Sequence, residues 1–467
     1  MRYVSTRGDA PALGFREVVL AGLARDGGLY VPERWPELTR SEIAALAGLS
    51  YAEAAFRIVG LFTGGEIAAP ALRRMIDDSY GAFRHEAVTP LVQLKPNLFL
   101  LELFHGPTLA FKDVAMQFLA RLMDEILAEK RERATIVCAT SGDTGGAAIE
   151  AFRGRERIDI AVLFPQGRVS PVQRRQMTTA REANVQVIAV EGTFDDAQAL
   201  VKGMFNDHRF RDRVGLSGVN SINWGRIVAQ IVYYFVAGVA LGAPYRPVSF
   251  TVPTGNFGNI FAGYAAKRMG LPIEKLVIAT NSNDILHRAL STGRYEAHGV
   301  TATSSPSMDI EVSSNFERLL FEAEGRDAAK VRRSLSGLAQ SGAFTLGESA
   351  LDFMRTTFSS GSADEDRTAA TIAKVKRECG MLIDPHSAVG VSVAEQHLGA
   401  VPMIALATAH PAKFPDAVEA ACGERPELPD WARPILSREE SYRVLPADLD
   451  AIEKAVESRI HAMMVVG

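Results

Sequence analysis

The sequence predicts an α/β fold with open, mainly parallel sheets covered by helices on both faces, preceded by a small, mostly helical N-terminal domain. Three observations support this. The 467 residues are 47% hydrophobic and 23% charged, as in a globular protein with a large core. Beyond about residue 90, apolar runs of strand length alternate with helical patterns, which indicates parallel strands. Before that point the patterns are mostly helical, as in FREVVLAGLARDGG.

In chain order, the predicted domains are residues 1–90, a first α/β domain at 91–215 and a second α/β domain at 216–467. The segment IVYYFVAGVALGAP, from Ile231, is too short to span a bilayer and is predicted to be a buried helix. The stretches 359–367 and 424–434 have the composition of surface loops. The strand-length apolar runs are ATIVCAT (134–140), IDIAVLFP (158–165), VQVIAV (185–190), VSFTVP (248–253), EKLVIAT (274–280) and PMIALAT (402–408).

Composition excludes several functional classes. A net charge of −4 gives no basic surface for nucleic acid. Cys138, Cys379 and Cys422 form no CxxC pair, and no HExxH motif is present, so we expect neither a disulfide framework nor a metal site. The first residues, MRYVSTRGDAP, contain no apolar signal region. These features predict a cytoplasmic protein that binds neither membrane nor nucleic acid.

Lys112 lies in FHGPTLAFKDVAMQFLARLMDEIL, residues 104–127. At about 100° per residue it falls among the apolar side chains of an amphipathic helix, whereas Asp113 falls on the opposite, polar face. Thr108 stands where an N-cap would precede the helix. Two interpretations remain open here: Lys112 reaches water from the first turn, or burial lowers the pKa of its amine and makes it a nucleophile.

Three turns follow predicted strands, at the sheet edge where ligands bind in this class of fold. PTGNFGN (253–259) can place backbone N–H groups around an anion, or it can be an ordinary tight turn. In ATSGDTGGAA (139–148), Ser141 and Thr144 offer hydroxyls, whereas Asp143 or Thr144 can instead cap the next helix. Thr408 can meet a heteroaromatic nitrogen or be an N-cap. Lys413, among loop residues, is expected to be solvated.

The ordered motifs resemble those of the threonine synthase family, in its longer bacterial and fungal form. The resemblance extends from residue 3 to the C-terminal region. The motifs are YVSTRGDAP, GLARDGGLYVPE, FHGPTLAFKDVAMQF, TSGDTGGAAI, SINWGRI, PTGNFGNI, SMDIEVSSNFERLLF, DPHSAVG and TAHPAKFPDAV.

The resemblance implies fold type II of the pyridoxal-phosphate enzymes, with pyridoxal 5'-phosphate as cofactor. Lys112 would form the Schiff base with the cofactor, and Thr408 would face its pyridine nitrogen. The cofactor phosphate would lie in the turn formed by Gly255, Asn256, Phe257, Gly258 and Asn259. Substrate and cofactor ring would face Ser141, Gly142, Asp143 and Thr144. Asp143 stands where shorter relatives of the fold carry Asn.

The resemblance further implies the last step of threonine biosynthesis, in which O-phospho-L-homoserine and water give L-threonine and phosphate by γ-elimination and β-addition. For the phosphate of the substrate, the candidate residues are Ser313, Ser314, Asn315 and Arg318, and His105 and Thr108 can contact either this phosphate or that of the cofactor. Arg226 and the segment 168–177 are alternatives, and the Arg174–Arg175 pair can instead be a solvated helix face. Rival functions are a phospholyase with the same substrate, a serine or threonine dehydratase, and a catalytically silent paralogue. The sequence leaves the oligomeric state open.

Overall fold

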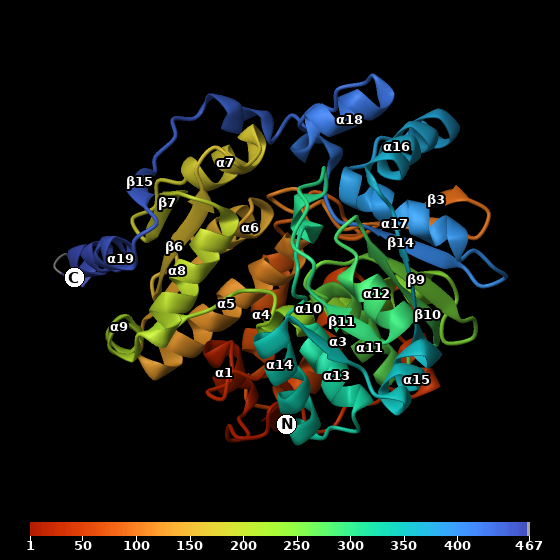
Figure 1. The fold of residues 1–467 in the computed structure, drawn as a ribbon, viewed down its shortest axis with the longest axis horizontal. Helices are drawn as coiled ribbons and strands as arrows, with labels where there is room; N and C mark the ends of the chain where they lie inside the picture. Colours follow the sequence, from red (N-terminus) through yellow and green to blue (C-terminus); the bar gives the residue numbers. More distant parts are fainter. Residues whose placement is uncertain (465–467) are drawn as a thin grey trace.

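The computed structural model describes residues 1–464, which form two mainly parallel sheets. The strand order of the first sheet is β15-β7-β6-β5-β8, and all neighbours are parallel. Its strands are β5 (Ala134–Ala139), β6 (Ile158–Pro165), β7 (Val185–Glu191), β8 (Leu216–Ser217) and β15 (Arg443–Pro446). In Figure 1, strands β6, β7 and β15 of this first sheet lie in one half of the molecule. Strands β9, β10 and β14, which belong to the second sheet, lie in the other half.

The second sheet has the order β13-β10-β9-β14-β4-β3 and is parallel except where β3 pairs with β4. Its strands are β3 (Leu91–Lys95), β4 (Leu98–Glu102), β9 (Val248–Pro253), β10 (Ile273–Thr280), β13 (Phe358–Ser362) and β14 (Met403–Ala407). Two small antiparallel pairs join β1 (Tyr3–Ser5) to β2 (Tyr30–Pro32) and β11 (Arg294–Glu296) to β12 (Ala343–Thr345).

Helices fall into groups around the sheets. The N-terminal segment contributes α1 (Phe15–Ala21), α2 (Arg40–Ala44), α3 (Tyr51–Thr63) and α4 (Ala69–Tyr80). Around the first sheet lie α5 (Lys112–Lys130), α6 (Asp143–Phe152), α7 (Pro171–Thr178), α8 (Phe194–Asn206), α9 (His208–Val214) and α19 (Leu449–Met464). The remaining helices are α10 (Trp224–Ala240), α11 (Gly258–Arg268), α12 (Ile285–Thr292), α13 (Phe316–Ala323), α14 (Ala328–Ser341), α15 (Glu348–Thr357), α16 (Glu365–Cys379), α17 (Pro385–Gln396) and α18 (Pro415–Cys422), with short 3-10 helices η1 (Pro306–Met308), η2 (Pro411–Lys413) and η3 (Arg433–Ser437).

Alternate residues of each central strand face different cores, because successive side chains of a strand point to opposite faces. In β14, Ile404 and Leu406 join the large central core with α10 and α11, whereas Met403, Ala405 and Ala407 join a second core with α16 and α17. In β5, Ile136 belongs to the central core and Val137 to a third core under α8 and α19. Both sheets are therefore covered on two faces, which explains why their strands read as continuous apolar runs.

The predicted α/β architecture is confirmed, and the six apolar runs are strands β5, β6, β7, β9, β10 and β14. The expected buried helix after Ile231 forms part of α10. The interpretation of 359–367 as a surface loop was wrong for most of that stretch, because residues 358–362 form edge strand β13 against β10 and α16 begins at Glu365. Sheet membership does not follow the limits 91–215 and 216–467, since β3 and β4 join the second sheet and β15 joins the first. Those limits stay a prediction about domains.

The C-terminal segment extends from α18 across the top of the molecule in Figure 1, past α7, to β15 and α19 beside α8. It thus links the two halves of the fold. Among residues 1–464, no helix has the length and apolar character needed to cross a membrane.

Candidate active site

Lys112 is the first residue of α5, in the segment that follows the carboxyl end of β4. Lys112 is 7% exposed. The Nζ atom donates to Asp143 Oδ2 at 3.1 Å and to Ser307 Oγ at 3.3 Å, and lies 4.8 Å from the centre of the Phe111 ring. Burial lowers the pKa of the Lys112 amine, although the Asp143 carboxylate opposes that shift. The solvated alternative for Lys112 is therefore wrong, and the amine is poised to act as a nucleophile.

The expected helix cap at Thr108 was wrong. α5 begins four residues later, and Asp113 accepts from both the backbone N–H of Thr108 at 2.8 Å and its hydroxyl at 2.7 Å. Asp113 is fully buried, so the polar face predicted for it is covered as well. Burial raises the pKa of Asp113 to about 6. These two bonds fix the chain just before Lys112 and leave the Thr108 carbonyl as an acceptor.

Asp143 is the first residue of α6 and links several parts of the site. Its Oδ1 accepts from Gln173 Nε2 at 2.8 Å and lies 2.8 Å from Lys413 Nζ. Its Oδ2 faces Lys112 and accepts from the Ser307 hydroxyl at 3.4 Å. Burial alone would raise the pKa of Asp143, but the two lysines hold it well below its usual range. Asp143 is therefore an ionised carboxylate shared by two lysines.

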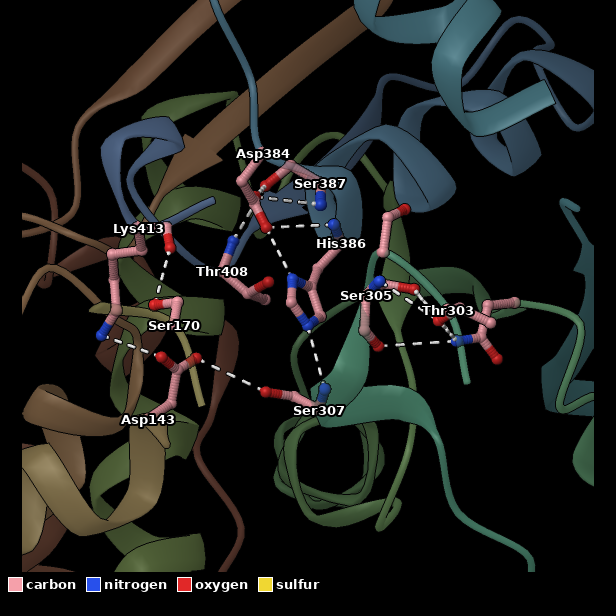
Figure 2. A network of polar contacts seen from close by, with 12 residues as sticks. Asp143, Ser170, Thr303, Ser305, Ser307, Asp384, His386, Ser387, Thr408 and Lys413 are labelled. Atoms are coloured by element: carbon pink, nitrogen blue, oxygen red, sulfur yellow. Dashed lines mark hydrogen bonds and ion pairs between the residues drawn. The ribbon is translucent and has the colours of Figure 1, made fainter. Parts of the chain in front are cut away.

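Lys413 is not solvated, contrary to the expectation from its loop sequence. It has no exposed surface, and its Nζ donates to the Thr108 carbonyl at 2.8 Å in addition to facing Asp143 (Figure 2). The residue lies in η2, between β14 and α18, and its carbonyl accepts from the Ser170 hydroxyl at 3.2 Å. The loop composition was a poor guide because the partners come from segments distant in the sequence.

A polar chain leads from Asp143 to Thr408 (Figure 2). The backbone N–H of Ser307 donates to His386 Nε2 at 3.1 Å, and His386 Nδ1 lies 2.7 Å from Asp384 Oδ2. Asp384 also accepts from the backbone N–H and the hydroxyl of Ser387. That hydroxyl accepts from the backbone N–H of Thr408 at 3.2 Å. The network fixes Thr408 at the carboxyl end of β14, where it is 5% exposed.

The turn at 255–259 connects β9 to α11. Phe257 has φ +64°, the left-handed region that is uncommon for a residue with a side chain, and it is packed against Phe316 and Phe358. A Cβ on Gly255 would lie 2.7 Å from the Ser307 carbonyl oxygen, so only glycine allows this approach. The hydroxyls of Tyr233 and Tyr234 donate to Asn259 Oδ1 at 2.6 and 3.0 Å.

Asn259 has a further property that points to a ligand. Its Nδ2 is buried and, among the described residues, has no hydrogen-bond partner. A buried donor of this kind is costly unless an acceptor meets it. The amide lies in the first turn of α11, where backbone N–H groups also favour an anion. The turn thus has the chemistry of an anion site.

Residues 313–315 donate hydrogen bonds to this turn, and Arg318 follows them in α13. Ser313 Oγ donates to the Gly255 carbonyl at 2.7 Å, and Ser314 Oγ donates to Asn256 Oδ1 at 3.0 Å. Asn315 donates to the Asn256 carbonyl through both its backbone N–H and its amide. Arg318 is fully buried and donates to the carbonyls of residues 30 and 222 and to Asn315. The interpretation of Arg318 as a phosphate ligand is therefore wrong, because its guanidinium is committed to protein acceptors.

The turn after β5 is stabilised by a residue that the sequence did not single out. The hydroxyl of Thr140 accepts from the backbone N–H groups of Gly142 and Gly145, both at 2.9 Å. Neither Asp143 nor Thr144 caps α6. Gly142 has φ +137°, and a Cβ there would overlap the Gln173 side chain. Ser141 and Thr144 are half-buried beside Asp143.

Other candidate anion ligands have partners elsewhere. Arg174 binds Glu440 at 2.8 Å, and Arg175 donates to the Arg438 carbonyl. Arg226 is buried and its Nη1 donates to the Val219 carbonyl at 3.3 Å, but its buried Nε has no hydrogen-bond partner among the described residues, so it stays an alternative. His105 pairs with Glu102 at 2.7 Å and lines a cavity of about 750 Å³ whose lining does not include Lys112. The structure thus brings Lys112, residues 141–144, the 255–259 turn and Thr408 into one connected region, but gives His105 different surroundings.

Sequence reasoning missed Ser307, Asp384, His386 and Gln173. A signal existed for two of them: in DPHSAVG, an aspartate stands two residues before a histidine, and a carboxylate can orient an imidazole through its Nδ1. Ser307 and Gln173 carried no local signal, since their role arises only from their position beside Asp143.

A buried lysine at one helix start and an anion cradle at another, both at the carboxyl ends of parallel strands, define a site for a phosphorylated aldehyde cofactor. The family model described as pyridoxal-phosphate dependent enzyme matches residues 82–403. Models described as threonine synthase N terminus and threonine synthase, C-terminal match residues 2–80 and 387–456.

Full-length relatives agree. Threonine synthase from Pseudomonas aeruginosa is 52% identical over 98% of both chains. The solved structure of PLP-bound threonine synthase from Brucella melitensis is 62% identical, with a TM-score of 0.96 over 98% of this chain and 99% of that one. The Escherichia coli threonine synthase structure is 32% identical, with a TM-score of 0.84 over 98% and 100%. The chain belongs to the threonine synthase family of pyridoxal-phosphate-dependent enzymes.

Proposed function

We propose that this chain converts O-phospho-L-homoserine and water into L-threonine and phosphate by γ-elimination and β-addition of water, the last step of threonine biosynthesis. The observation that carries the proposal is the buried Lys112 amine with a lowered pKa, in a chain similar over its whole length to threonine synthases. A lysine in that state suits covalent capture of an aldehyde.

The residues present fit pyridoxal 5'-phosphate. Lys112 would hold its aldehyde carbon, and the turn of Gly255, Asn256, Phe257, Gly258 and Asn259 would hold its phosphate. The unpartnered Nδ2 of Asn259 and the start of α11 support that assignment. Thr408 would face the pyridine nitrogen with a neutral hydroxyl. When bound, the cofactor supplies an electron sink for the carbon attached to the substrate amine.

The chain's own groups then bind the substrate and move its protons. The freed amine of Lys112 would act as general base at the substrate α-carbon. Ser141, Gly142 and Thr144 would meet the substrate carboxylate through hydroxyl and backbone donors at the start of α6, where an anion is favoured. Asp143 would stay ionised and orient Lys112 and Ser307 through the contacts already described.

As contacts for the substrate phosphate, we keep some of the candidate residues and exclude others. Half-buried Ser314, whose hydroxyl donates to Asn256 Oδ1, is kept as a proposed contact, whereas the hydroxyl and backbone N–H of Thr108 are committed to Asp113. Asn315 supports the turn rather than reaching a ligand, and Arg318 is excluded by its protein partners. His105 is kept only for a substrate that extends towards the cavity it lines.

Two further proposals complete the function. We expect the chain to act in the cytoplasm, as its cysteine usage suggests. We also expect a small-molecule substrate and neither nucleic acid nor membrane as partner.

The decisive experiment is product identification. Purified protein loaded with pyridoxal phosphate is given O-phosphohomoserine, and the products are identified by mass spectrometry while phosphate release is followed. Threonine in step with phosphate supports the proposal. Phosphate with a keto acid would identify a phospholyase instead, a serine or threonine substrate turned over without phosphate would identify a dehydratase, and no turnover would indicate a silent paralogue.

A further inference from the structure

Lys413 is a second buried lysine at the site, and the proposed reaction gives it no step. Its Nζ lies 2.8 Å from Asp143 Oδ1, whereas Lys112 Nζ lies 3.1 Å from the other oxygen of the same carboxylate. Two ammonium groups thus face one carboxylate, in a region with little access to water. If both lysines were protonated, the cluster would carry an uncompensated buried positive charge, which is costly.

The contacts indicate which lysine keeps its proton. Lys413 has no exposed surface, and its Nζ meets two strong acceptors, Asp143 Oδ1 and the Thr108 carbonyl, both at 2.8 Å. Lys112 has longer contacts, 3.1 Å to Asp143 and 3.3 Å to a hydroxyl. The shorter, charge-assisted contacts favour the ammonium form at Lys413. Lys112 is therefore the lysine that can release its proton at least cost.

Other charged groups facing the cluster do not change this result. His386 accepts the Ser307 N–H at Nε2, and its Nδ1 faces Asp384 at 2.7 Å. Arg226 is a further cation that acts on Lys112 and opposes its protonation. Gln173 donates to Asp143 Oδ1 and fixes the carboxylate without adding charge. The titratable groups that act on Asp143 are Lys112, Lys413 and His386.

We propose that Lys413 is the permanent counter-ion of Asp143, and that it thereby leaves Lys112 free to give up its proton and react with an aldehyde. Lys413 is then a positioning residue, because it acts through Asp143 and touches no reacting atom. It also keeps Asp143 ionised after Lys112 has been consumed in a covalent bond, when no other ammonium group faces that carboxylate in the described residues. The inference rests on the proposed role of Lys112 as the cofactor lysine.

The test is the pH dependence of cofactor capture by the apo-protein. The rate at which apo-protein and pyridoxal phosphate form the yellow, borohydride-reducible product is measured from about pH 6 to about pH 11.5 for wild type and for K413Q, K413M and K413R. Because only the neutral amine reacts, the midpoint of the profile reports ionisation of Lys112. A unit charge at about 6 Å, with an effective dielectric constant of about 20, changes such a midpoint by about two pH units.

We expect K413Q and K413M to shift the midpoint upward by about one to two pH units, and therefore to slow capture at pH 7.5 by about 10- to 100-fold. K413R, which keeps the charge, should restore the wild-type midpoint. The matched control is K267Q: Lys267 is half-buried, donates to the Ile273 carbonyl and has no contact with Asp143, so its profile should be that of wild type.

Three results would overturn the inference: a folded K413Q with the wild-type midpoint, a K413R that behaves like K413Q, or a wild-type midpoint at the ordinary lysine value of about 10.4. The last measurement needs no variant, so it decides the matter even if the Lys413 variants do not fold. Peptide mapping after borohydride reduction keeps this outcome separate from failure of the proposed function. If the label lies on a lysine other than Lys112, the cofactor assignment fails first.

Discussion

Replacing Asn259 by Asp tests the assignment of the 255–259 turn as the phosphate site. The hydroxyls of Tyr233 and Tyr234 donate to Asn259 Oδ1, and a carboxylate accepts those bonds equally well. The substitution therefore preserves the local structure and changes one thing: the buried, unpartnered Nδ2 donor becomes an oxygen carrying negative charge.

The expected magnitude follows from that geometry. A unit negative charge about 4 Å from a phosphate charge, at an effective dielectric constant of about 20, costs about 4 kcal/mol. Protonating the new carboxyl at pH 7.5 instead costs about 5 kcal/mol from an ordinary pKa of about 3.9, and less where burial raises that pKa, so about 4 kcal/mol is the largest loss expected. We expect N259D to bind pyridoxal phosphate up to about 1,000-fold more weakly than wild type.

The assay is a titration of apo-protein with pyridoxal phosphate, followed by absorbance, with thermal melting of the apo-protein as the check on folding. The control is N206D, which makes the same change of net charge at an exposed residue at the end of α8. N206D should bind as wild type does. An N259D variant that is folded and binds the cofactor within about threefold of wild type would refute the phosphate-site assignment.

Three further predictions concern other parts of the site. K112A should lose the yellow colour of the lysine-bound cofactor and all turnover; borohydride-trapped cofactor on this variant would show that another lysine is used. D384A removes the acceptor of His386 Nδ1 and of two backbone N–H groups at the start of α17, and should cost about 3 kcal/mol in urea unfolding, whereas an unchanged midpoint would show that the network is not structural. Burial raises the pKa of Asp113 to about 6, above its unfolded value of about 3.9. The folded state therefore binds more protons than the unfolded state between about pH 4 and 6. The free energy of unfolding should fall as pH rises through that window, by up to about 3 kcal/mol. D113N should flatten this dependence in denaturation curves at pH 4.5 and 7.5, and a slope equal to that of wild type would contradict the assignment.

The strands that the sequence predicts correctly are those whose burial can be inferred from their own residues. Strands β6, β9 and β14 are buried on both faces, so each is a continuous apolar run. The strands that were not predicted include β3, β8, β13 and β15, which lie at sheet edges. An edge strand needs little burial and tolerates polar or small residues, so FSSGS in β13 was interpreted as a loop. Its pairing with β10 depends on a neighbour, not on its own composition.

The same distinction applies to the site. The burial of Lys112 was legible because its neighbours on α5 are apolar. The burial of Lys413 was not, because its partner carbonyl at Thr108 is 305 residues away in the sequence. Asp113 shows the opposite error: it was placed on an exposed polar face, but it is buried because its hydrogen-bond partner, Thr108, lies before the helix. Charged residues are thus the ones for which local pattern predicts environment least well.

The N-terminal segment, for which the sequence analysis predicts no chemical role, contacts the site through α13. Glu317 accepts from Thr6 and Arg7, and Glu322 accepts from Trp35. Arg318 donates to the Tyr30 carbonyl at 3.0 Å. Residues 313–315, immediately before α13, donate hydrogen bonds to the 255–259 turn. The contacts between the N-terminal segment and α13 therefore help to position that turn.

The segment between β14 and α18 does the same for the opposite side of the site, through Thr408 and Lys413. Arg318 on one side and Lys413 on the other are fully buried cations whose acceptors come from distant parts of the chain. A buried cation is tolerated only when its acceptors are in place, so neither side can form by itself without leaving that buried charge unpaired. Assembly of the cofactor site is thereby coupled to folding of the whole chain, which explains why segments so remote from Lys112 in the sequence share one architecture with it.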